Sequence, residues 1–333
     1  MERKHFIKTM ATGAIGITTL SAFKIFTNSD LSTETITPQD KNQRKKMAQE
    51  LATFGAVHLN VTNLQRSVAF WTDNIGMKVR NTTAEYTELG TEKNTLVVLY
   101  PTAKTPFKNG YSGLYHLAIH PATESEFARV LARLIARRYP ISPTDHTMSK
   151  AIYMTDPDGI TVEITLETPE RLERLDFSNG APKAIDKDGT VRSPSAPLDV
   201  PSVLKTLPDS DVSRTLADDT YVGHMHLYVS NLEAANDFYL GLGFIQNMRL
   251  PHLGMYDLGA GGAFKHRIAF NAWHSLNKPQ APEGTAGLRY YTIKFDTVDR
   301  LKAALQHLPN AQPVNEGYLV ADPAGNKILL KFE

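Results

Sequence analysis

FGAVHLNVTNLQRSVAFWTDNIGMKV, residues 54–79, has a counterpart in VGHMHLYVSNLEAANDFYLGLGFIQN, residues 222–247. Both copies begin with apolar residues at every second position, a pattern that predicts a β-strand. An Asn-Leu pair follows in each, and Asn63 and Asn231 are predicted to cap amphipathic helices. A glycine and a second apolar run end each copy, so the repeat predicts a strand–helix–strand unit.

A second, weaker repeat extends this pattern. GLYHLAI (residues 113–119) matches GLRYYTI (residues 287–293), and each precedes an amphipathic helix, a strand, a DPDG or DPAG turn and a final strand. The chain therefore predicts an α+β fold of four βαβββ modules. We expect them to pair within each half, into cup-shaped mixed sheets over residues 51–168 and 221–333. Residues 169–220, rich in Pro, Asp and Ser, are expected to form a linker.

The N-terminus resembles an export signal over residues 1–26. The basic start MERKHFIK precedes the apolar run TMATGAIGITTLSAF, as in a signal peptide, and this run is too short for a comfortable membrane span. RKHFIK is similar to a twin-arginine signal, with Lys4 in the second arginine position. We expect export to the periplasm or another extracytoplasmic compartment, with a polar tether at residues 27–50. An uncleaved N-terminal helix on a cytoplasmic protein is the alternative.

Composition indicates a globular chain of about two domains, with 333 residues of which 41% are hydrophobic and 21% charged. The formal net charge of +1 creates no field that would attract nucleic acid, and no basic stripe with interleaved aromatic residues is present. We therefore expect no nucleic-acid partner and no stable membrane span in the mature protein. The absence of cysteine excludes disulfides, thiolate metal ligands and cysteine nucleophiles. A homo-oligomer is left open.

From residue 54 onward the chain resembles the vicinal oxygen chelate superfamily, which includes glyoxalase I, bleomycin-resistance proteins and type I extradiol dioxygenases. GLYHLAI and DHTMSKAIYMTDPDGITVEI, residues 145–164, carry the resemblance most strongly. Within the superfamily the chain is most similar to two-domain bacterial catechol 2,3-dioxygenases. The resemblance implies ring cleavage in aromatic compound catabolism, with a small aromatic diol and O2 as substrates.

Three polar residues interrupt apolar strands and are candidate metal ligands: His58, His116 and Glu163. A carboxylate on such a strand is costly to bury unless it is paired or holds a metal. Two imidazoles and one carboxylate form the facial triad that leaves positions open on Fe(II). The resemblance implies that these three residues bind one Fe(2+), with Mn(2+) as the other option.

The second half departs from this ligand pattern. His226 matches His58, but Tyr290 and Leu329 stand in the places of His116 and Glu163. We therefore expect a scaffold half with a degenerate site. Three histidines of this half, His224, His226 and His266, are expected to form a polar lining, although a different site is an alternative.

Two further residues resemble the surroundings of an extradiol site. The resemblance implies that His146 contacts the substrate or bound oxygen and that Tyr153 donates to a substrate oxygen. A histidine suits proton transfer near neutral pH, and a surface turn at Asp145–His146 is the blander alternative. The additional acid–base histidine that many type I extradiol enzymes carry before the second ligand is missing, because no histidine lies between His58 and His116.

The sequence thus favours an extradiol dioxygenase over two alternatives. A glyoxalase-like isomerase or lyase usually uses a fourth ligand on the last strand of the first module, but TLVVLYP at residues 95–101 offers none. A metal-free binding protein of the bleomycin-resistance kind would not need three matched ligands.

Overall fold

The structure is a computed structural model and describes residues 50–178 and 182–332. The expected export signal at residues 1–26 lies outside the described residues, as does the expected tether up to residue 49. In the part of the chain that the structure describes, no helix is long and apolar enough to cross a membrane.

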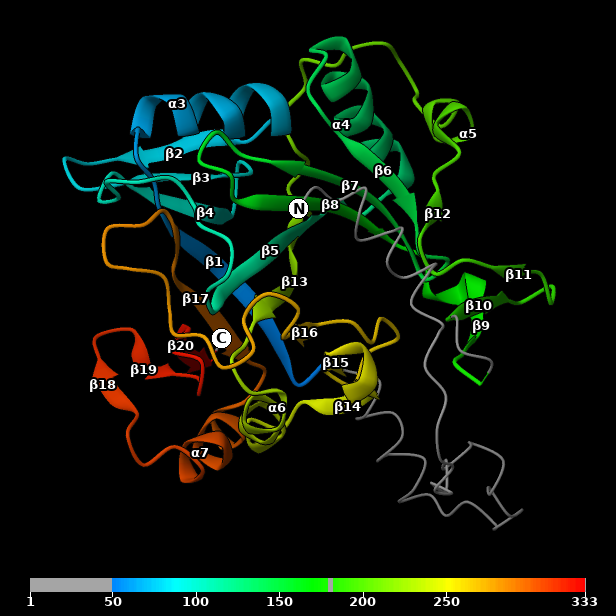
Figure 1. The fold of residues 1–333 in the computed structure, drawn as a ribbon. Coiled ribbons are helices and arrows are strands. Elements are labelled where there is room, and N and C mark those ends of the chain that lie inside the picture. The colour runs from blue at the N-terminus through cyan, green and yellow to red at the C-terminus, as the bar shows by residue number, and fades with distance from the viewer. Residues whose placement is uncertain (1–49, 179–181, 333) are drawn as a thin grey trace.

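Four βαβββ modules follow one another along the chain, and the expected α+β fold is confirmed (Figure 1). The first contains β1 (Ala52–Asn60), α3 (Leu64–Ala69) with a π-helical turn (Phe70–Ile75), β2 (Lys78–Thr82), β3 (Thr87–Gly90) and β4 (Thr95–Tyr100). The second contains β5 (Gly113–His120), α4 (Glu124–Ala136), β6 (Ser142–Asp145), β7 (Ser149–Thr155) and β8 (Thr161–Glu167). The third contains β13 (Tyr221–Tyr228), α6 (Leu232–Gly241), β14 (Ile245–Leu250), a 3-10 turn (Pro251–Leu253), β15 (Met255–Gly259) and β16 (Ile268–Asn271). The fourth contains β17 (Gly287–Phe295), α7 (Val298–Gln306), β18 (Gln312–Val314), β19 (Gly317–Ala321) and β20 (Lys327–Phe332).

The two predicted helix caps are present. The side-chain oxygens of Asn63 and Asn231 each accept from the backbone N–H three residues later, at 2.9 and 3.1 Å. Each such cap stabilises its helix by about 1 kcal/mol. The apolar stripes that follow the caps place Trp71 and Tyr239 in the core, where both are fully buried.

The strands form two large mixed sheets, and each sheet joins modules from both halves of the chain. The first sheet has the order β18-β19-β20-β17-β1-β4-β3-β2, and the second has the order β12-β6-β7-β8-β5-β13-β16-β15-β14. This order differs from the expected pairing within each half, because β1 pairs antiparallel with β17 and β13 with β5. Each module exposes the edge of its first strand, and either pairing scheme would cover these edges. The module sequences alone therefore do not show which modules pair.

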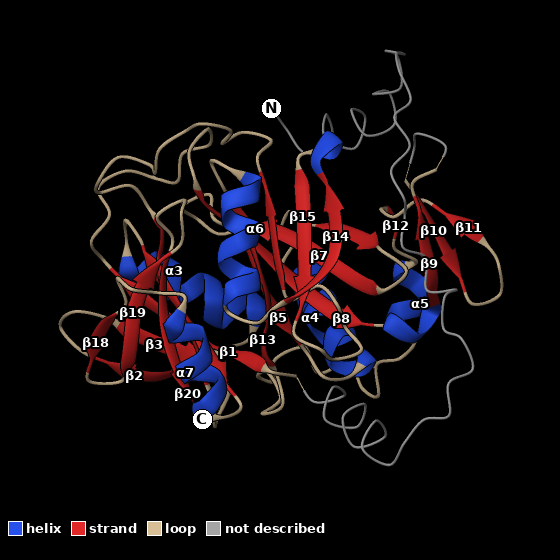
Figure 2. Cartoon of the chain, turned by 90° about the horizontal axis from the view of Figure 1, so that it is seen from below, coloured by secondary structure: helices blue, strands red, loops and turns tan. Residues whose placement is uncertain are grey.

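Residues 169–220 connect the halves, and parts of the described stretches 169–178 and 182–220 pack against the second module. They contain a 3-10 turn (Pro169–Arg171), β9 (Leu172–Asp176), β10 (Lys183–Asp186), β11 (Val191–Arg192), β12 (Ala196–Pro197) and α5 (Val200–Leu204). β9, β10 and β11 form a small separate sheet at the side of the molecule, whereas β12 extends the second sheet (Figure 2). Two buried arginines of α4 hold the segment, since Arg129 donates to Asp209 at 2.7 Å and Arg133 to the Val212 carbonyl at 2.8 Å.

Two turns of the same pattern connect the last two strands of the second and fourth modules. Asp156 Oδ1 accepts from the backbone N–H groups of Asp158 and Ile160, at 2.9 and 2.8 Å. Gly159 has a φ of 86°, which a glycine adopts without strain. Asp322 makes the corresponding two bonds in the fourth module. Burial, reinforced by the charge of Asp158, raises the pKa of Asp156 to about 7.

We expect Asp156→Asn to become more stable relative to the wild type as the pH rises from about 4 to about 8. The unfolded carboxyl ionises near its model value of 3.8, but the folded one ionises only near 7, so the wild type loses folding free energy between these values. The difference in unfolding free energy should change by about 2–4 kcal/mol. Urea denaturation of both proteins across this range measures it. A difference that does not vary with pH would contradict the raised pKa.

Candidate metal centre

Three donor atoms from three adjacent strands meet in the second sheet. His116 Nε2 and His224 Nε2 each lie 3.0 Å from Glu163 Oε2. The two imidazole nitrogens are 3.3 Å apart. All three residues are buried, with no more than 2% of each exposed. Within residues 50–178 and 182–332, this triad is the one group of His, Asp or Glu donors close enough to share a metal ion.

The strand register explains why these side chains converge. β5 carries His116 and lies between β8, which carries Glu163, and β13, which carries His224. Glu163 and His224 are both paired with Ala118 of β5, one from each side. Ala118 is two residues from His116 and therefore faces the same side of the sheet. Its single methyl group leaves room between the donors.

The spacing of the donors fits one divalent transition metal ion. Two ligands at right angles around an ion, each about 2.1 Å from it, are about 3.0 Å apart. Two imidazoles and one carboxylate on one face of an octahedron leave three positions open, the donor set of non-haem Fe(II) oxygenases. A bound cation would also offset the cost of burying the Glu163 carboxylate.

The ionisation states of the triad suit a metal. Burial raises the pKa of Glu163, but the attraction of His224 and His116 in their protonated forms outweighs it and holds this pKa well below its usual value. Burial lowers the pKa of His224 well below its usual value, and Glu163 opposes the shift only in part. At neutral pH the triad therefore offers an ionised carboxylate and a neutral His224, the forms that bind metals.

The candidate catalytic residues His146 and Tyr153 lie beside the triad. Tyr153 is paired with Glu163 across β7 and β8, and its ring centroid is 5.6 Å from that of His116. His146 Nδ1 donates to the carbonyl of Pro194, 2.6 Å away. The segment that joins the halves thereby fixes the tautomer of His146. Its Nε2 is left to accept from the Tyr153 hydroxyl, 3.0 Å away.

The third module supplies two more histidines around the triad. The ring centroid of His226 lies 4.8 Å from that of His116, and the centroid of His266 lies 4.7 Å from that of His224. Burial lowers the pKa of His266, but the carboxylate of Asp257, 3.0 Å from its Nδ1, outweighs burial and raises the pKa above its usual value. These side chains surround the triad instead of lining a separate degenerate site.

His58 requires a correction, because the structure places it away from the triad. It lies on β1 in the first sheet, where it is paired with Tyr290 of β17. Its ring stacks on Tyr290 at a centroid distance of 3.8 Å, and its Nδ1 is 3.0 Å from the Tyr100 hydroxyl. Burial is the main cause that lowers the pKa of His58 to about 3. The expected convergence of His58 with His116 and Glu163 does not occur.

His224 takes the third place, although the sequence predicts only a polar lining for it. The repeat aligns His226, not His224, with His58. In the structure, the register of β13 against β5 is irregular at Gly223, and His224 lies across from Ala118. The two histidines of GHMH, residues 223–226, were the sequence signal that could have indicated the third ligand. Choosing between them required the pairing of β13 with β5, which the order of modules does not reveal.

The first sheet carries different residues at the corresponding positions. Ala56, Tyr290 and Leu329 occupy the places that the triad takes in the second sheet. A cavity of about 1010 Å³ borders Tyr290 and Leu329. Its lining contains no histidine, so the cavity does not coincide with the triad.

Comparisons with known proteins agree with this architecture. The family model of the Glyoxalase/Bleomycin resistance protein/Dioxygenase superfamily matches residues 53–164. A catechol-2,3-dioxygenase of Bacillus subtilis (strain 168) is 30% identical over 280 residues, which cover 81% of this chain and 93% of the relative. The chain belongs to this superfamily. The resemblance predicted from the sequence is therefore confirmed.

Two solved structures of superfamily architecture share the fold. A candidate dioxygenase from Bacillus subtilis subsp. subtilis str. 168 matches with a TM-score of 0.55 and 12% identity, over 86% of each chain. A single-residue variant of glyoxalase I from Zea mays matches with a TM-score of 0.50 and 14% identity, over 87% of this chain and 96% of that one. At these identities the likeness concerns the fold alone.

The triad makes a direct prediction about metal binding. Glu163→Ala and His224→Ala should each weaken the binding of Zn(II) or Co(II) to chelator-treated protein by more than about 100-fold, because each removes a ligand. His58→Ala, the matched control in the first sheet, should stay within about threefold of the wild type. Competition titration measures the affinities. Loss of binding in His58→Ala but not in His224→Ala would refute the assignment.

Proposed function

We propose that this protein is an extradiol ring-cleaving dioxygenase that acts on a catechol-type substrate with O2. Fe(II) would be held by His116, His224 and Glu163, and Mn(II) is the alternative ion. The observation that carries the proposal is the buried group of two imidazoles and one carboxylate. The catechol-2,3-dioxygenase relative, matched over 93% of its length, supports this reading of the group.

The chain would hold the ion through His116 Nε2, His224 Nε2 and Glu163 Oε2. When bound, Fe(II) would supply adjacent open positions for the two catechol oxygens and O2. The near-complete burial of the three side chains would limit competition from bulk water. The raised pKa of His266, whose ring neighbours His224, favours a positive charge there and hence an anionic substrate.

His146 and Tyr153 are arranged to accept a proton from the substrate. Burial lowers the pKa of His146, against the opposing charge of Glu163, so the imidazole is neutral at pH 7. Its Nε2 accepts from the Tyr153 hydroxyl, and the hydroxyl oxygen can in turn accept from a substrate hydroxyl at the triad. The proton would then move from the substrate to Tyr153 Oη and from there to His146 Nε2.

Anaerobic loading with Fe(II), followed by a panel of catechols and air, tests the proposal through the absorbance of the ring-fission product. The wild type should cleave at least one catechol. Tyr153→Phe should lower kcat by about 10²-fold or more, because the proton path loses its first acceptor. His58→Phe should retain kcat. A wild type that binds Fe(II) but cleaves no catechol, and instead isomerises a glutathione hemithioacetal, would overturn the proposal in favour of a glyoxalase-like enzyme.

Export through the twin-arginine-like segment at residues 1–26 stays a prediction from the sequence, and we propose it together with the function. The native protein should appear outside the cytoplasmic membrane on fractionation. Arg3→Lys combined with Lys4→Gln should retain it inside, because the paired basic residues are what such a signal presents. An unchanged location of this variant, or a wild type found only in the cytoplasm, would refute the signal.

A further inference from the structure

A second histidine–glutamate pair lies four residues beyond the first along the same two strands. His116 and Glu163 are in contact, and so are His120 and Glu167, whose Nδ1 and Oε1 atoms are 2.9 Å apart. β5 and β8 run parallel, so an equal step along both strands preserves the contact between them. His120 is fully buried. The proposed reaction gives this second pair no role.

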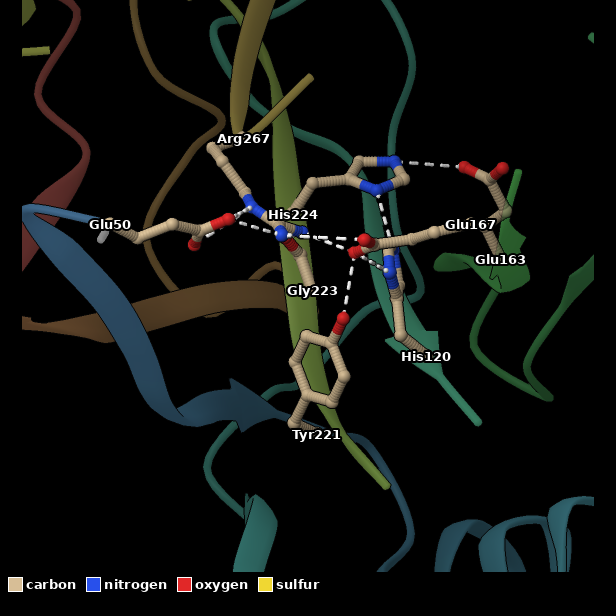
Figure 3. A network of polar contacts seen from close by, with 8 residues as sticks. All are labelled: Glu50, His120, Glu163, Glu167, Tyr221, Gly223, His224 and Arg267. Carbon is tan, nitrogen blue, oxygen red and sulfur yellow. Dashed lines mark hydrogen bonds and ion pairs between the residues drawn. The ribbon is translucent and has the colours of Figure 1, made fainter. Parts of the chain in front are cut away.

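Glu167 acts purely as an acceptor in this pair. Its Oε1 also accepts from the Tyr221 hydroxyl at 2.7 Å and from the guanidinium of Arg267 (Figure 3). Burial raises the pKa of Glu167, but His120 and Arg267 outweigh it and lower the pKa to about 2. An ionised carboxylate has no proton to donate. The hydrogen bond between His120 and Glu167 therefore requires the proton to sit on His120 Nδ1.

This proton position is transmitted to the triad. With Nδ1 protonated, neutral His120 presents a lone pair at Nε2, and His224 Nδ1 is 2.9 Å from that atom. His224 must then carry its proton on Nδ1, where it donates to His120. The lone pair of His224 Nε2 is left facing Glu163 Oε2, 3.0 Å away. Figure 3 shows this line of contacts from Glu167 through His120 and His224 to Glu163.

The backbone around the pair is shaped to hold it. Gly223 lies against the ring of His120, and a Cβ at this position would be 2.1 Å from His120 Cγ. A side chain at residue 223 is thus incompatible with the observed ring position. Arg267 donates to the Gly223 carbonyl at 3.0 Å and to Glu50 Oε1 at 2.6 Å, so the cation that orients Glu167 is itself anchored on both sides.

We propose that His120 and Glu167 are positioning residues that fix the metal-binding tautomer of His224. The relay, defined here as Glu167, His120 and His224, presents the His224 Nε2 lone pair to the ion and prevents rotation of the ring. Contacts of this kind, from a carboxylate to the far nitrogen of a ligand histidine, typically change metal affinity by 10- to 100-fold. Here a second histidine is interposed. The inference rests on the proposed metal centre and specifies how it is tuned.

Zinc titration of the full chain after chelator treatment tests the relay. His120→Phe keeps an aromatic ring but removes the acceptor for His224 Nδ1–H, and should weaken Zn(II) binding by about 10- to 100-fold. His120→Gln places an amide oxygen near the former Nε2 and should recover part of this loss. His58→Phe is the matched control, a partly buried histidine of the first sheet, and should leave the affinity within about threefold.

A second measurement reports the tautomer directly. In the 15N-labelled, zinc-loaded wild type, the His224 Nδ1–H proton should be protected from exchange with solvent, and in His120→Phe it should exchange faster. If His120→Phe does not fold, Glu167→Gln carries the test. Zinc affinity within about threefold of the wild type in folded His120→Phe, or in Glu167→Gln where His120→Phe does not fold, with His224 Nδ1–H exchange unchanged, would overturn the relay.

These outcomes are distinguishable from failure of the proposed function. Zinc affinity and proton exchange do not depend on ring cleavage. If no catechol is cleaved but His120→Phe loses zinc affinity, the relay stands and the proposed reaction fails. If catechol is cleaved and His120→Phe binds zinc as the wild type does, the relay alone fails.

Discussion

The antiparallel pairing of β5 with β13 is the interaction on which the metal centre depends. It brings His224 from the second half of the chain beside His116 and Glu163 of the first half. A register shift of one residue would turn His224 to the opposite face of the sheet, because strand side chains alternate. The same pairing sets His120 against Gly223. One strand interface therefore positions both the ligand and the group that orients it.

The features that short sequence patterns determine could be predicted from the sequence. The Asn63 cap, the Asp156 turn and the strand positions of His116 and Glu163 follow from short patterns that the structure repeats. The third ligand could not be found in this way. The choice between His58 and His224 depends on which module edges meet, and that choice reflects packing over the whole chain. The sequence places His116 and His120 four residues apart, on one face of a strand. It gives His120 no role, because the contact between His120 and Glu167 becomes apparent only in the structure.

The two sheets show how one architecture supports two different interiors. The first sheet places a stacked pair, His58 on Tyr290, where the second places imidazoles around a carboxylate. The stacked pair of His58 and Tyr290 needs no cation. In the triad, the relay turns a lone pair of His224 toward the carboxylate, and two acceptors at 3.0 Å repel unless a cation lies between them. Metal binding would thereby stabilise the second sheet more than the first.

The crossed pairing of modules also has a consequence for biosynthesis. Residues up to Glu167 leave the ribosome first, and they already contain two of the three donors. They cannot complete either sheet, because β1 awaits β17 and β5 awaits β13. Domains usually fold as units during synthesis, N-terminal ones first, but here neither half can be finished alone. The nascent chain must keep its second module soluble until the third has been translated, and its first module until nearly the whole chain has been translated. A bound metal would then mark a chain whose synthesis has passed residue 224.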